Sequence, residues 1–203
     1  MELVKGYRFF SEDDCTRVMR YCDEKEKQMR KFHQALVKSG DADNNPKIPL
    51  TQRYHSQYNF FEENPQHIPR LLACIREVLP ALEFPVAVQA WVNIYRKGQG
   101  IMWHTHGGKN GYSWSANVFL GGETAPGIYY ATNPDKVFNV ENEVGAMHVF
   151  PHSLNHMVPP IETNQKRYTL GITVHGFQAI DKPLIEGVAL DRAHRETIIL
   201  AGD

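Results

Sequence analysis

The sequence has little of what marks secreted, membrane-spanning or nucleic-acid-binding proteins. Its 203 residues include only three cysteines, which form neither an even disulfide framework nor a metal-binding spacing. No apolar run approaches the roughly 20 residues of a membrane helix, and the first residues lack the layout of a signal peptide. The formal net charge of −1 gives no electrostatic reason to expect nucleic acid or a membrane surface as a partner. We therefore expect reduced thiols and a cytoplasmic location.

The first part of the chain, residues 1–84, has the pattern of a helical buttress after a short edge strand within residues 1–10. Ser11 followed by three acidic residues is typical of a helix start. Apolar residues then recur at helical spacing as far as Gly40, which ends the predicted helix. Asn64-Pro65 predicts a second helix start, because proline suits the first helical position.

Between these helices, Thr51–Phe61 is aromatic and polar. This composition predicts a strand or a flap close to the functional site. The segment is therefore expected to act as a lid.

From residue 85 to 177 the pattern changes to short runs of β-branched and aromatic residues separated by Gly, Pro and Asn. Such spacing favours a sandwich or barrel. We predict one domain that is mainly β with N-terminal helices: a double-stranded β-helix (jelly roll, cupin-like) buttressed by helices. Residues 178–203 are expected to form a C-terminal arm or helix. The predicted strands are Val86–Tyr95, Ile101–His106, Tyr112–Leu120, Gly127–Thr132, Met147–Phe150 and Arg167–Val174.

His104 and His106 stand one residue apart in a predicted strand, so both side chains point to the same face. Two adjacent imidazoles supply part of a metal site, and His156, from a distant segment, supplies a third. Three neutral imidazoles leave positions open on a mid-row divalent ion. The sequence therefore predicts a three-histidine metal centre.

Arg167 lies in an apolar predicted strand, where a guanidinium is costly unless it meets an anion. Its planar fork suits a carboxylate, and Thr169 places a hydroxyl on the same face. Together they predict a pocket for a small dicarboxylate whose other end chelates the metal. Asn93 and Tyr95 share a face of the preceding strand and could bond the same ligand or the substrate. The alternative for Arg167 is a structural ion pair with Glu141 or Glu143.

These motifs stand in the runs “YRKGQGIMWHTH”, “GGET”, “GIYY”, “VGAMHVFPHSLNHMV” and “KRYTLGITV”. Over residues 86–176 they resemble the 2-oxoglutarate/Fe(II)-dependent oxygenase superfamily, and most closely its small microbial and phage-type members, in which an H-x-H pair can replace H-x-D. The resemblance implies Fe(II) as cofactor, 2-oxoglutarate as cosubstrate and O2 as oxidant. The implied reaction is hydroxylation of an unactivated carbon in a small molecule or an amino-acid or peptide side chain.

By the same resemblance, His104 and His156 match the two metal histidines, and His106 falls at the acid position. Either His106 coordinates the metal, or the site has two histidines and an open position. Arg167 and Thr169 match the R-x-S/T pair that holds the distal carboxylate of 2-oxoglutarate, with Tyr95 beside them. Residues expected to contact substrate are Asn93, Trp114 and Asn117.

Two other classes remain open. A cupin-type metalloprotein, either a dioxygenase, an isomerase or a binder, fits the glycine and histidine spacing nearly as well, but gives Arg167 no role. A jelly-roll binding module with a degenerate site predicts no metal at all. The oxygenase prediction names a small-molecule or peptide substrate as partner, with no nucleic acid and no membrane, and is compatible with a homodimer.

Overall fold

The computed structural model describes residues 3–40, 42, 47, 49–106, 113–133, 135–176 and 197–201. Helices occupy the first half of the chain and strands the second, as the sequence predicts. The helical elements are α1 (Glu12–Ser39), α2 (Leu50–Arg53), η1 (His55–Gln57), α3 (Phe60–Glu63), η2 (Pro65–His67) and α4 (Ile68–Val78). The strands are β1 (Lys5–Arg8), β2 (Val86–Tyr95), β3 (Ile101–His104), β4 (Ser113–Gly122), β5 (Ile128–Asn133), β6 (Lys136–Val140), β7 (Ala146–Pro151), β8 (Asn155–Val158), β9 (Arg167–Gly176) and β10 (Thr197–Leu200).

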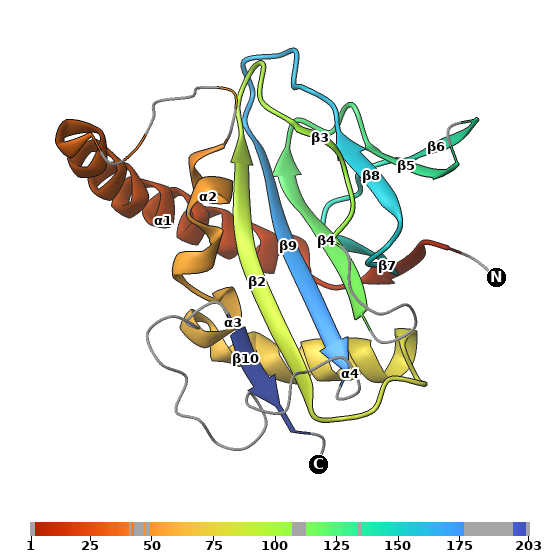
Figure 1. Ribbon diagram of the computed structural model, residues 1–203. Coiled ribbons are helices and arrows are strands. Elements are labelled where there is room, and N and C mark those ends of the chain that lie inside the picture. Colours follow the sequence, from red (N-terminus) through yellow and green to blue (C-terminus); the bar gives the residue numbers. More distant parts are fainter. Residues whose placement is uncertain are drawn as a thin grey trace.

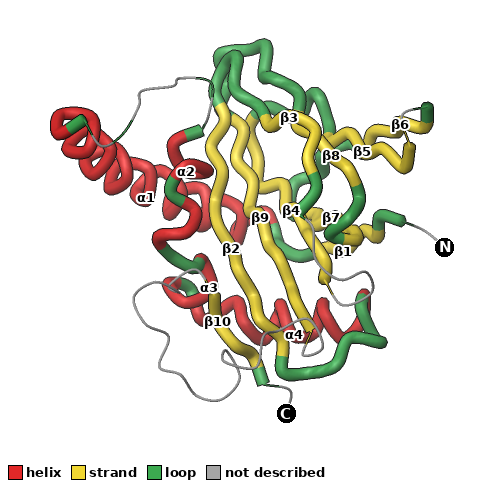
Figure 2. Tube along the Cα trace, in the orientation of Figure 1, coloured by secondary structure: helices red, strands yellow, loops and turns green. Residues whose placement is uncertain are grey.

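The strands form two antiparallel sheets (Figure 1). The larger sheet has six strands in the order β1-β7-β4-β9-β2-β10, and the smaller has four in the order β3-β8-β5-β6. Figure 2 shows the long helices α1 and α4 on the side of the larger sheet away from the smaller one. The jelly-roll prediction is therefore confirmed: two sheets enclose a space, and the N-terminal helices support the larger sheet from outside.

The central strands β2, β4 and β9 are buried on both faces, and the two faces carry different kinds of side chain. Side chains alternate along a strand, so one face packs on the helices and the other looks between the sheets. The helix-facing residues are apolar: Val88, Ala90, Val92, Ile94, Val118, Leu170, Ile172 and Val174. The opposite face carries polar and aromatic side chains, including Asn93, Tyr95 and Arg167, and these lie in or beside the candidate site.

Helix α1 begins and ends where the sequence predicts. The Ser11 side chain accepts a hydrogen bond from the Asp14 backbone N–H, and the Asp14 carboxylate accepts from the Ser11 N–H. At the other end Gly40 adopts φ 83°, a left-handed conformation that glycine takes without strain. The helix is held to the strands by Glu26, whose buried carboxylate accepts hydrogen bonds from both Nη atoms of Arg96.

Asp14 also ties α1 to α4, and this gives a pH-dependent prediction. Burial acts to raise the pKa of Asp14, but hydrogen bonds from Arg70, Ser11 and Arg17 outweigh it and hold the pKa well below its usual range. The contribution of Asp14 to stability is thus present above the unfolded pKa of about 3.9 and lost as pH falls below it.

We expect Asp14→Asn to lower the free energy of unfolding at pH 7 by about 1–3 kcal/mol, since it leaves Arg70 without its charged partner. The difference from the wild type should narrow below about pH 4. Urea unfolding at a series of pH values measures both effects. Asp13→Asn, an exposed position in the same turn, is the matched control. A difference that stays constant with pH would show that the charge of Asp14 is not the cause.

The segment predicted as a strand or flap, Thr51–Phe61, is instead a series of short helical turns: α2, η1 and α3. Its polar side chains bind the outer edge of β2. Ile94 N–H donates to Thr51 Oγ1 at 3.0 Å and Val92 N–H to Tyr58 Oη at 2.9 Å. The segment satisfies edge groups that another strand would otherwise pair with, and it carries Gln52 and His55 to the cavity.

The C-terminal prediction is only partly covered, because residues 177–196 lie outside the described residues. Within 178–203, Thr197–Leu200 forms β10, which pairs with Val86–Gln89 of β2. This part of the predicted arm or helix is therefore a strand.

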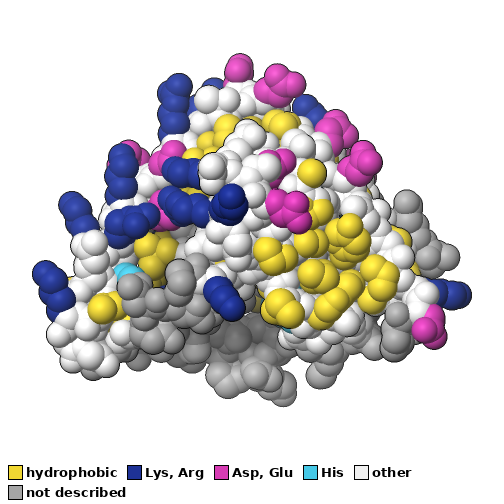
Figure 3. Space-filling view, turned by 90° about the horizontal axis from the view of Figure 1, so that it is seen from above, with side chains coloured by type: hydrophobic (Ala, Val, Ile, Leu, Met, Phe, Trp, Pro, Cys, Tyr) yellow, Lys and Arg dark blue, Asp and Glu magenta, His cyan; other side chains and the backbone are white. Residues whose placement is uncertain are grey.

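Hydrophobic and basic side chains are distributed unevenly over the molecular surface. Figure 3 shows hydrophobic side chains gathered over the smaller sheet and basic side chains over the helical side. The exposed apolar residues include Met102 and Trp103 on β3 and Val137 and Phe138 on β6. Among the described helices, none combines the length and apolar character needed to cross a membrane.

Candidate metal centre and its cavity

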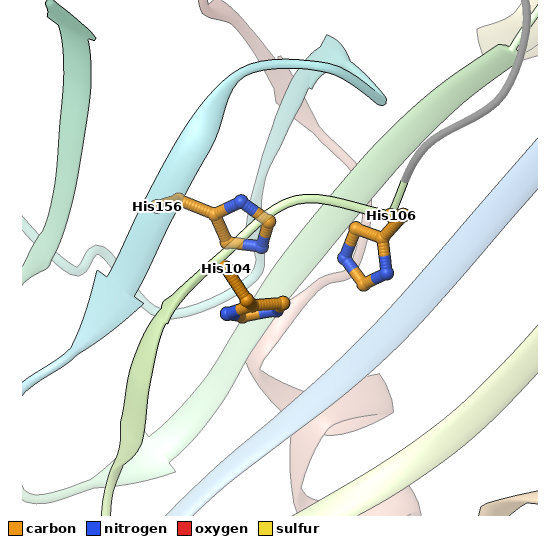
Figure 4. Close-up of side chains that lie close together, drawn as sticks. All are labelled: His104, His106 and His156. Atoms are coloured by element: carbon orange, nitrogen blue, oxygen red, sulfur yellow. The ribbon is translucent and has the colours of Figure 1, made fainter.

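Three histidines meet on the inner side of the smaller sheet (Figure 4). His104 on β3 and His156 on β8 are directly opposite in register, and their ring centroids are 4.2 Å apart. His106, just beyond β3, has its ring 5.0 Å from His104 and 5.1 Å from His156. One ligand nitrogen from each ring lies within 4.8 Å of the others. The donor set and its spacing fit a divalent metal ion.

Hydrogen bonds fix the orientation of two of these rings. His104 Nδ1 lies 2.8 Å from the Met102 carbonyl oxygen, and His156 Nδ1 lies 2.9 Å from that of Leu154. Because a carbonyl oxygen only accepts, Nδ1 must donate its proton in both cases, which leaves the Nε2 lone pair for a metal. Burial, reinforced by the neighbouring imidazoles, lowers the pKa of His156 to about 3 although the Leu154 carbonyl opposes it. The ring is therefore neutral, as metal binding requires.

A second pair of histidines extends from His106 along the cavity wall. The His152 ring lies 5.0 Å from His106 and 4.8 Å from His175. His152 Nδ1 is 2.8 Å from Ser115 Oγ, and His175 Nδ1 is 3.0 Å from Ser113 Oγ. Burial lowers the pKa of His152 to about 4 and also lowers that of His175. These rings add neutral hydrogen-bonding groups to the cavity.

The cavity between the sheets has a volume of about 400 Å³. The metal-site histidines line it from the smaller sheet, and β2, β4 and β9 line it from the larger one. Within the described part of the chain, no Asp, Glu, Lys or Arg side chain lines it. The larger sheet and the helical segment contribute Gln52, His55, Gln89, Trp91, Asn93, Tyr95, Ser115, Asn117, Gly171, Thr173 and His175.

Arg167 is fully buried beside one end of this cavity. Its Nη1 donates to the Pro126 carbonyl oxygen at 2.6 Å and its Nη2 to Asn142 Oδ1 at 3.1 Å. Of the five donors that a guanidinium carries, these bonds use two. Burial acts to lower the pKa of Arg167, as expected for a cation with incomplete compensation.

The alternative role for Arg167, an ion pair with Glu141 or Glu143, is not found. Glu143 pairs with Arg8 at 2.8 Å, and both glutamates are exposed. Arg167 forms no ion pair with any residue that the structure describes. Glu123 acts on the charge of Arg167 without forming an ion pair with it, so the buried guanidinium has no bonded carboxylate among the described residues. Such a cation is costly to bury.

Polar atoms without partners lie on Arg167 and on residues at this end of β2, β5 and β9. Tyr95 pairs with Arg167 and Asn93 with Thr169 in the register of β2 and β9. Burial raises the pKa of Tyr95 to about 12, so its hydroxyl keeps its proton. In the described part of the chain, the buried side-chain atoms that lack a hydrogen-bond partner are Asn93 Oδ1, Tyr95 Oη, Tyr130 Oη, Arg167 Nε and Thr169 Oγ1. The hydroxyls of Tyr95 and Thr169 are near enough for Thr169 to act against the rise in the Tyr95 pKa, but their contact does not have hydrogen-bond geometry. The hydroxyls and Arg167 Nε can donate hydrogen bonds, whereas Asn93 Oδ1 can only accept one. Buried polar groups are costly when unpaired, so these atoms are available to a polar ligand.

The structure brings together most of the residues predicted from the sequence. His104, His106 and His156 meet, Arg167, Thr169 and Tyr95 meet, and Asn93 and Asn117 line the same cavity. Trp114 does not line it. Since side chains alternate along β4, Trp114 points to the helix-facing side and borders a small apolar void with Leu71 of α4. We therefore remove Trp114 from the candidate substrate site.

Four further residues that line the cavity or lie beside Arg167 were not among the site residues predicted from the sequence. Tyr130 stands in the run “GIYY” and presents its hydroxyl beside Arg167, but alternation alone does not say which tyrosine points inward. Asn142 holds Arg167 from a loop, where no periodic signal exists. His152 and His175 have no motif spacing, although their residue type could have suggested a role.

No known family profile matches the chain, and no curated protein sequence matches it. Solved structures do match. A non-haem monooxygenase, ThoJ in complex with nickel, aligns with a TM-score of 0.60 at 12% identity, covering 100% of this chain and 81% of that one. A Pseudomonas putida prolyl-4-hydroxylase aligns with a TM-score of 0.54 at 13% identity, covering 87% and 94%. AviO1 from Streptomyces viridochromogenes aligns with a TM-score of 0.57 at 11% identity, covering 88% and 91%.

At these identities the likeness concerns the fold. It agrees with the family resemblance of the histidine and arginine motifs. The chain thus has the double-stranded β-helix fold of a non-haem monooxygenase and a prolyl-4-hydroxylase, with a histidine triad between its sheets.

Proposed function

We propose that this chain is an Fe(II)/2-oxoglutarate-dependent dioxygenase that hydroxylates an unactivated carbon of a small molecule or of an amino-acid or peptide side chain. The observation that carries the proposal is the pairing of two sites along one cavity. One offers three histidines to a metal. The other offers a buried guanidinium and unpartnered hydroxyls to a carboxylate. A cosubstrate that chelates a metal through one end and carries a carboxylate at the other uses both.

The residues present fit the cofactors. His104 and His156 have their Nε2 atoms free for Fe(II), and His106 completes the set. Three imidazoles differ from the usual two histidines and one carboxylate, but they offer the same number of ligands and leave room for other molecules. Iron with 2-oxoglutarate bound would supply the activation of O2.

The chain itself would bind and orient the cosubstrate and exclude water. Arg167 would hold the distal carboxylate with its free donors, and the hydroxyls of Tyr95, Thr169 and Tyr130 would donate to the same oxygens. Phe150, whose ring lies 4.7 Å from that of His156, would shield the metal side from solvent. Such burial strengthens each electrostatic contact.

The overall reaction is balanced as substrate R–H, 2-oxoglutarate and O2 giving R–OH, succinate and CO2. Succinate reports the decarboxylation of 2-oxoglutarate whichever substrate is hydroxylated. We therefore expect the iron-loaded protein to form succinate from 2-oxoglutarate in air, in a reaction that requires Fe(II). The His104→Ala variant should form none. Equal succinate formation by both proteins, or none by the wild type even when it is offered a broad panel of substrates, would contradict the proposal.

A further inference from the structure

The cavity is longer than the proposed cosubstrate site requires. Tyr95 lies opposite Arg167 at one end of the inner face of β2, and Gln89 lies opposite Thr173 at the other. Along a strand these positions are roughly 20 Å apart. A five-carbon dicarboxylate between Arg167 and the metal fills only one end. The part around Gln89, Trp91 and Thr173 is left for another molecule.

Trp91 dominates this remaining part. It lies directly opposite Gly171 in register. A Cβ atom at position 171 would stand 2.8 Å from Trp91 Cε2 and 2.9 Å from Cζ2, so the indole occupies space that only a glycine leaves free. The indole is partly exposed and lines the cavity. His55 places its ring 5.4 Å from the indole. The two rings contact each other and together form one aromatic wall of the cavity. Such a wall suits a flat ring packed against it, because aromatic rings attract one another in offset or tilted arrangements.

The other groups in this part are polar and carry no formal charge. Gln89 is held in place: its Nε2 donates to Thr197 Oγ1 at 3.0 Å, and Thr173 Oγ1 donates to its Oε1 at 3.4 Å. Gln52 and Asn117 add further amides to the lining. Since none of the described lining residues is Asp, Glu, Lys or Arg, a charged ligand group would lose water without gaining a counter-ion. An uncharged group that donates and accepts hydrogen bonds would be matched.

We propose that this part of the cavity binds an uncharged planar ring of the substrate, an aromatic or heteroaromatic ring that carries an amide or hydroxyl group, against Trp91. This inference rests on the proposed function, because it takes the Trp91 end of the cavity as the substrate end of an oxygenase site. It narrows the substrate class and assigns specificity to Trp91, which Gly171 accommodates, and to the amide of Gln89.

The test compares four probes of nearly equal size by NMR titration of the metal-free protein: benzamide, benzoate, benzamidine and cyclohexanecarboxamide. Benzamide is neutral and flat, the next two carry opposite charges, and the last is neutral but not flat. Followed at the indole signal of Trp91, benzamide should bind at least tenfold more tightly than the other three. It should shift the indole N–H signal of Trp91 and leave that of the exposed Trp103 unchanged. A charged probe that shifts the Trp91 signal with the same affinity as benzamide, or a shift of the Trp103 signal alone, overturns the inference; benzoate bound at Arg167 would leave the Trp91 signal unchanged.

Variants test the same point independently. Trp91→Leu should weaken benzamide binding roughly tenfold, the scale of an aromatic contact, and Trp91→Phe by less than threefold. Trp103→Leu is the matched control and should have no effect. Unchanged binding in Trp91→Leu overturns the inference; if that variant does not fold, the wild-type indole signal still decides. The probes need neither iron nor 2-oxoglutarate. A protein that binds benzamide at Trp91 but fails the oxygenase tests would therefore lose the proposed function and keep the ring site.

Discussion

Replacing Arg167 with leucine should raise the dissociation constant for 2-oxoglutarate by between about thirtyfold and a few thousandfold, while metal content stays near that of the wild type. The reason is that the distal carboxylate would be buried against Tyr95 and Thr169 without a positive charge. Truncating one member of a buried charge pair costs about 2–5 kcal/mol, and each 1.4 kcal/mol is tenfold in affinity. Calorimetric titration of the anaerobic Fe(II)-loaded protein with 2-oxoglutarate measures the dissociation constant, and metal analysis after gel filtration measures the metal content.

The controls separate ligand binding from a structural role. Arg167 also bonds Pro126 and Asn142, so thermal unfolding of each variant must accompany the titration. Arg167→Lys keeps the charge but not the fork, and should fall between the wild type and Arg167→Leu. Tyr95→Phe removes one hydroxyl and should cost roughly tenfold or less. If Arg167→Leu lost metal and folded structure while a stable lysine variant bound 2-oxoglutarate normally, the arginine would be a structural residue.

Removing one histidine of the triad has the second large effect. We expect His106→Ala and His156→Ala each to weaken Fe(II) binding by more than a hundredfold, since even groups that only support a ligand account for 10- to 100-fold. Metal content after gel filtration and anaerobic titration with Fe(II) measure the loss. His148→Ala is the control, because His148 is buried on β7 but does not line the cavity.

His106 is the informative member of the triad. His106→Asp should retain iron, because a carboxylate at this position supplies one oxygen ligand on the same face. Wild-type iron affinity and succinate formation in His106→Ala would show that the third ligand is elsewhere or that the centre has two histidines and an open position.

Much of the site could be predicted because strand periodicity is simple. The R-x-T pair places two side chains on one face of β9, and the strand β2 has the predicted bounds. The H-x-H pair was predicted to share a strand, but β3 ends at His104, and His106 reaches the site from just beyond it. The pairing of Asn93 with Thr169 and of Tyr95 with Arg167 could not be predicted, because register depends on contacts between distant strands. The resemblance to a known family supplied the reason to combine the histidine motif and the arginine motif into one site.

Other features depended on tertiary contacts that leave no local signal. Both faces of β4 are buried, so composition could not show that Asn117 faces the cavity and Trp114 the helices. The aromatic segment Thr51–Phe61 has strand-like residues but forms helical turns, because its side chains bind the edge of β2. The strand β8, which carries His156, is four residues long, too short for a periodic pattern.

The central claim is that one cavity holds both a metal and a chelating dicarboxylate anchored by Arg167. Anaerobic titration of the Fe(II)-loaded protein with 2-oxoglutarate, followed by visible absorption, tests it most directly. We expect a weak metal-to-ligand charge-transfer band that saturates with 2-oxoglutarate, and we expect Arg167→Leu to need far more 2-oxoglutarate to reach it. Bound iron with no band at any concentration of 2-oxoglutarate would rule out chelation of 2-oxoglutarate at this metal and favour a cupin-type metalloprotein.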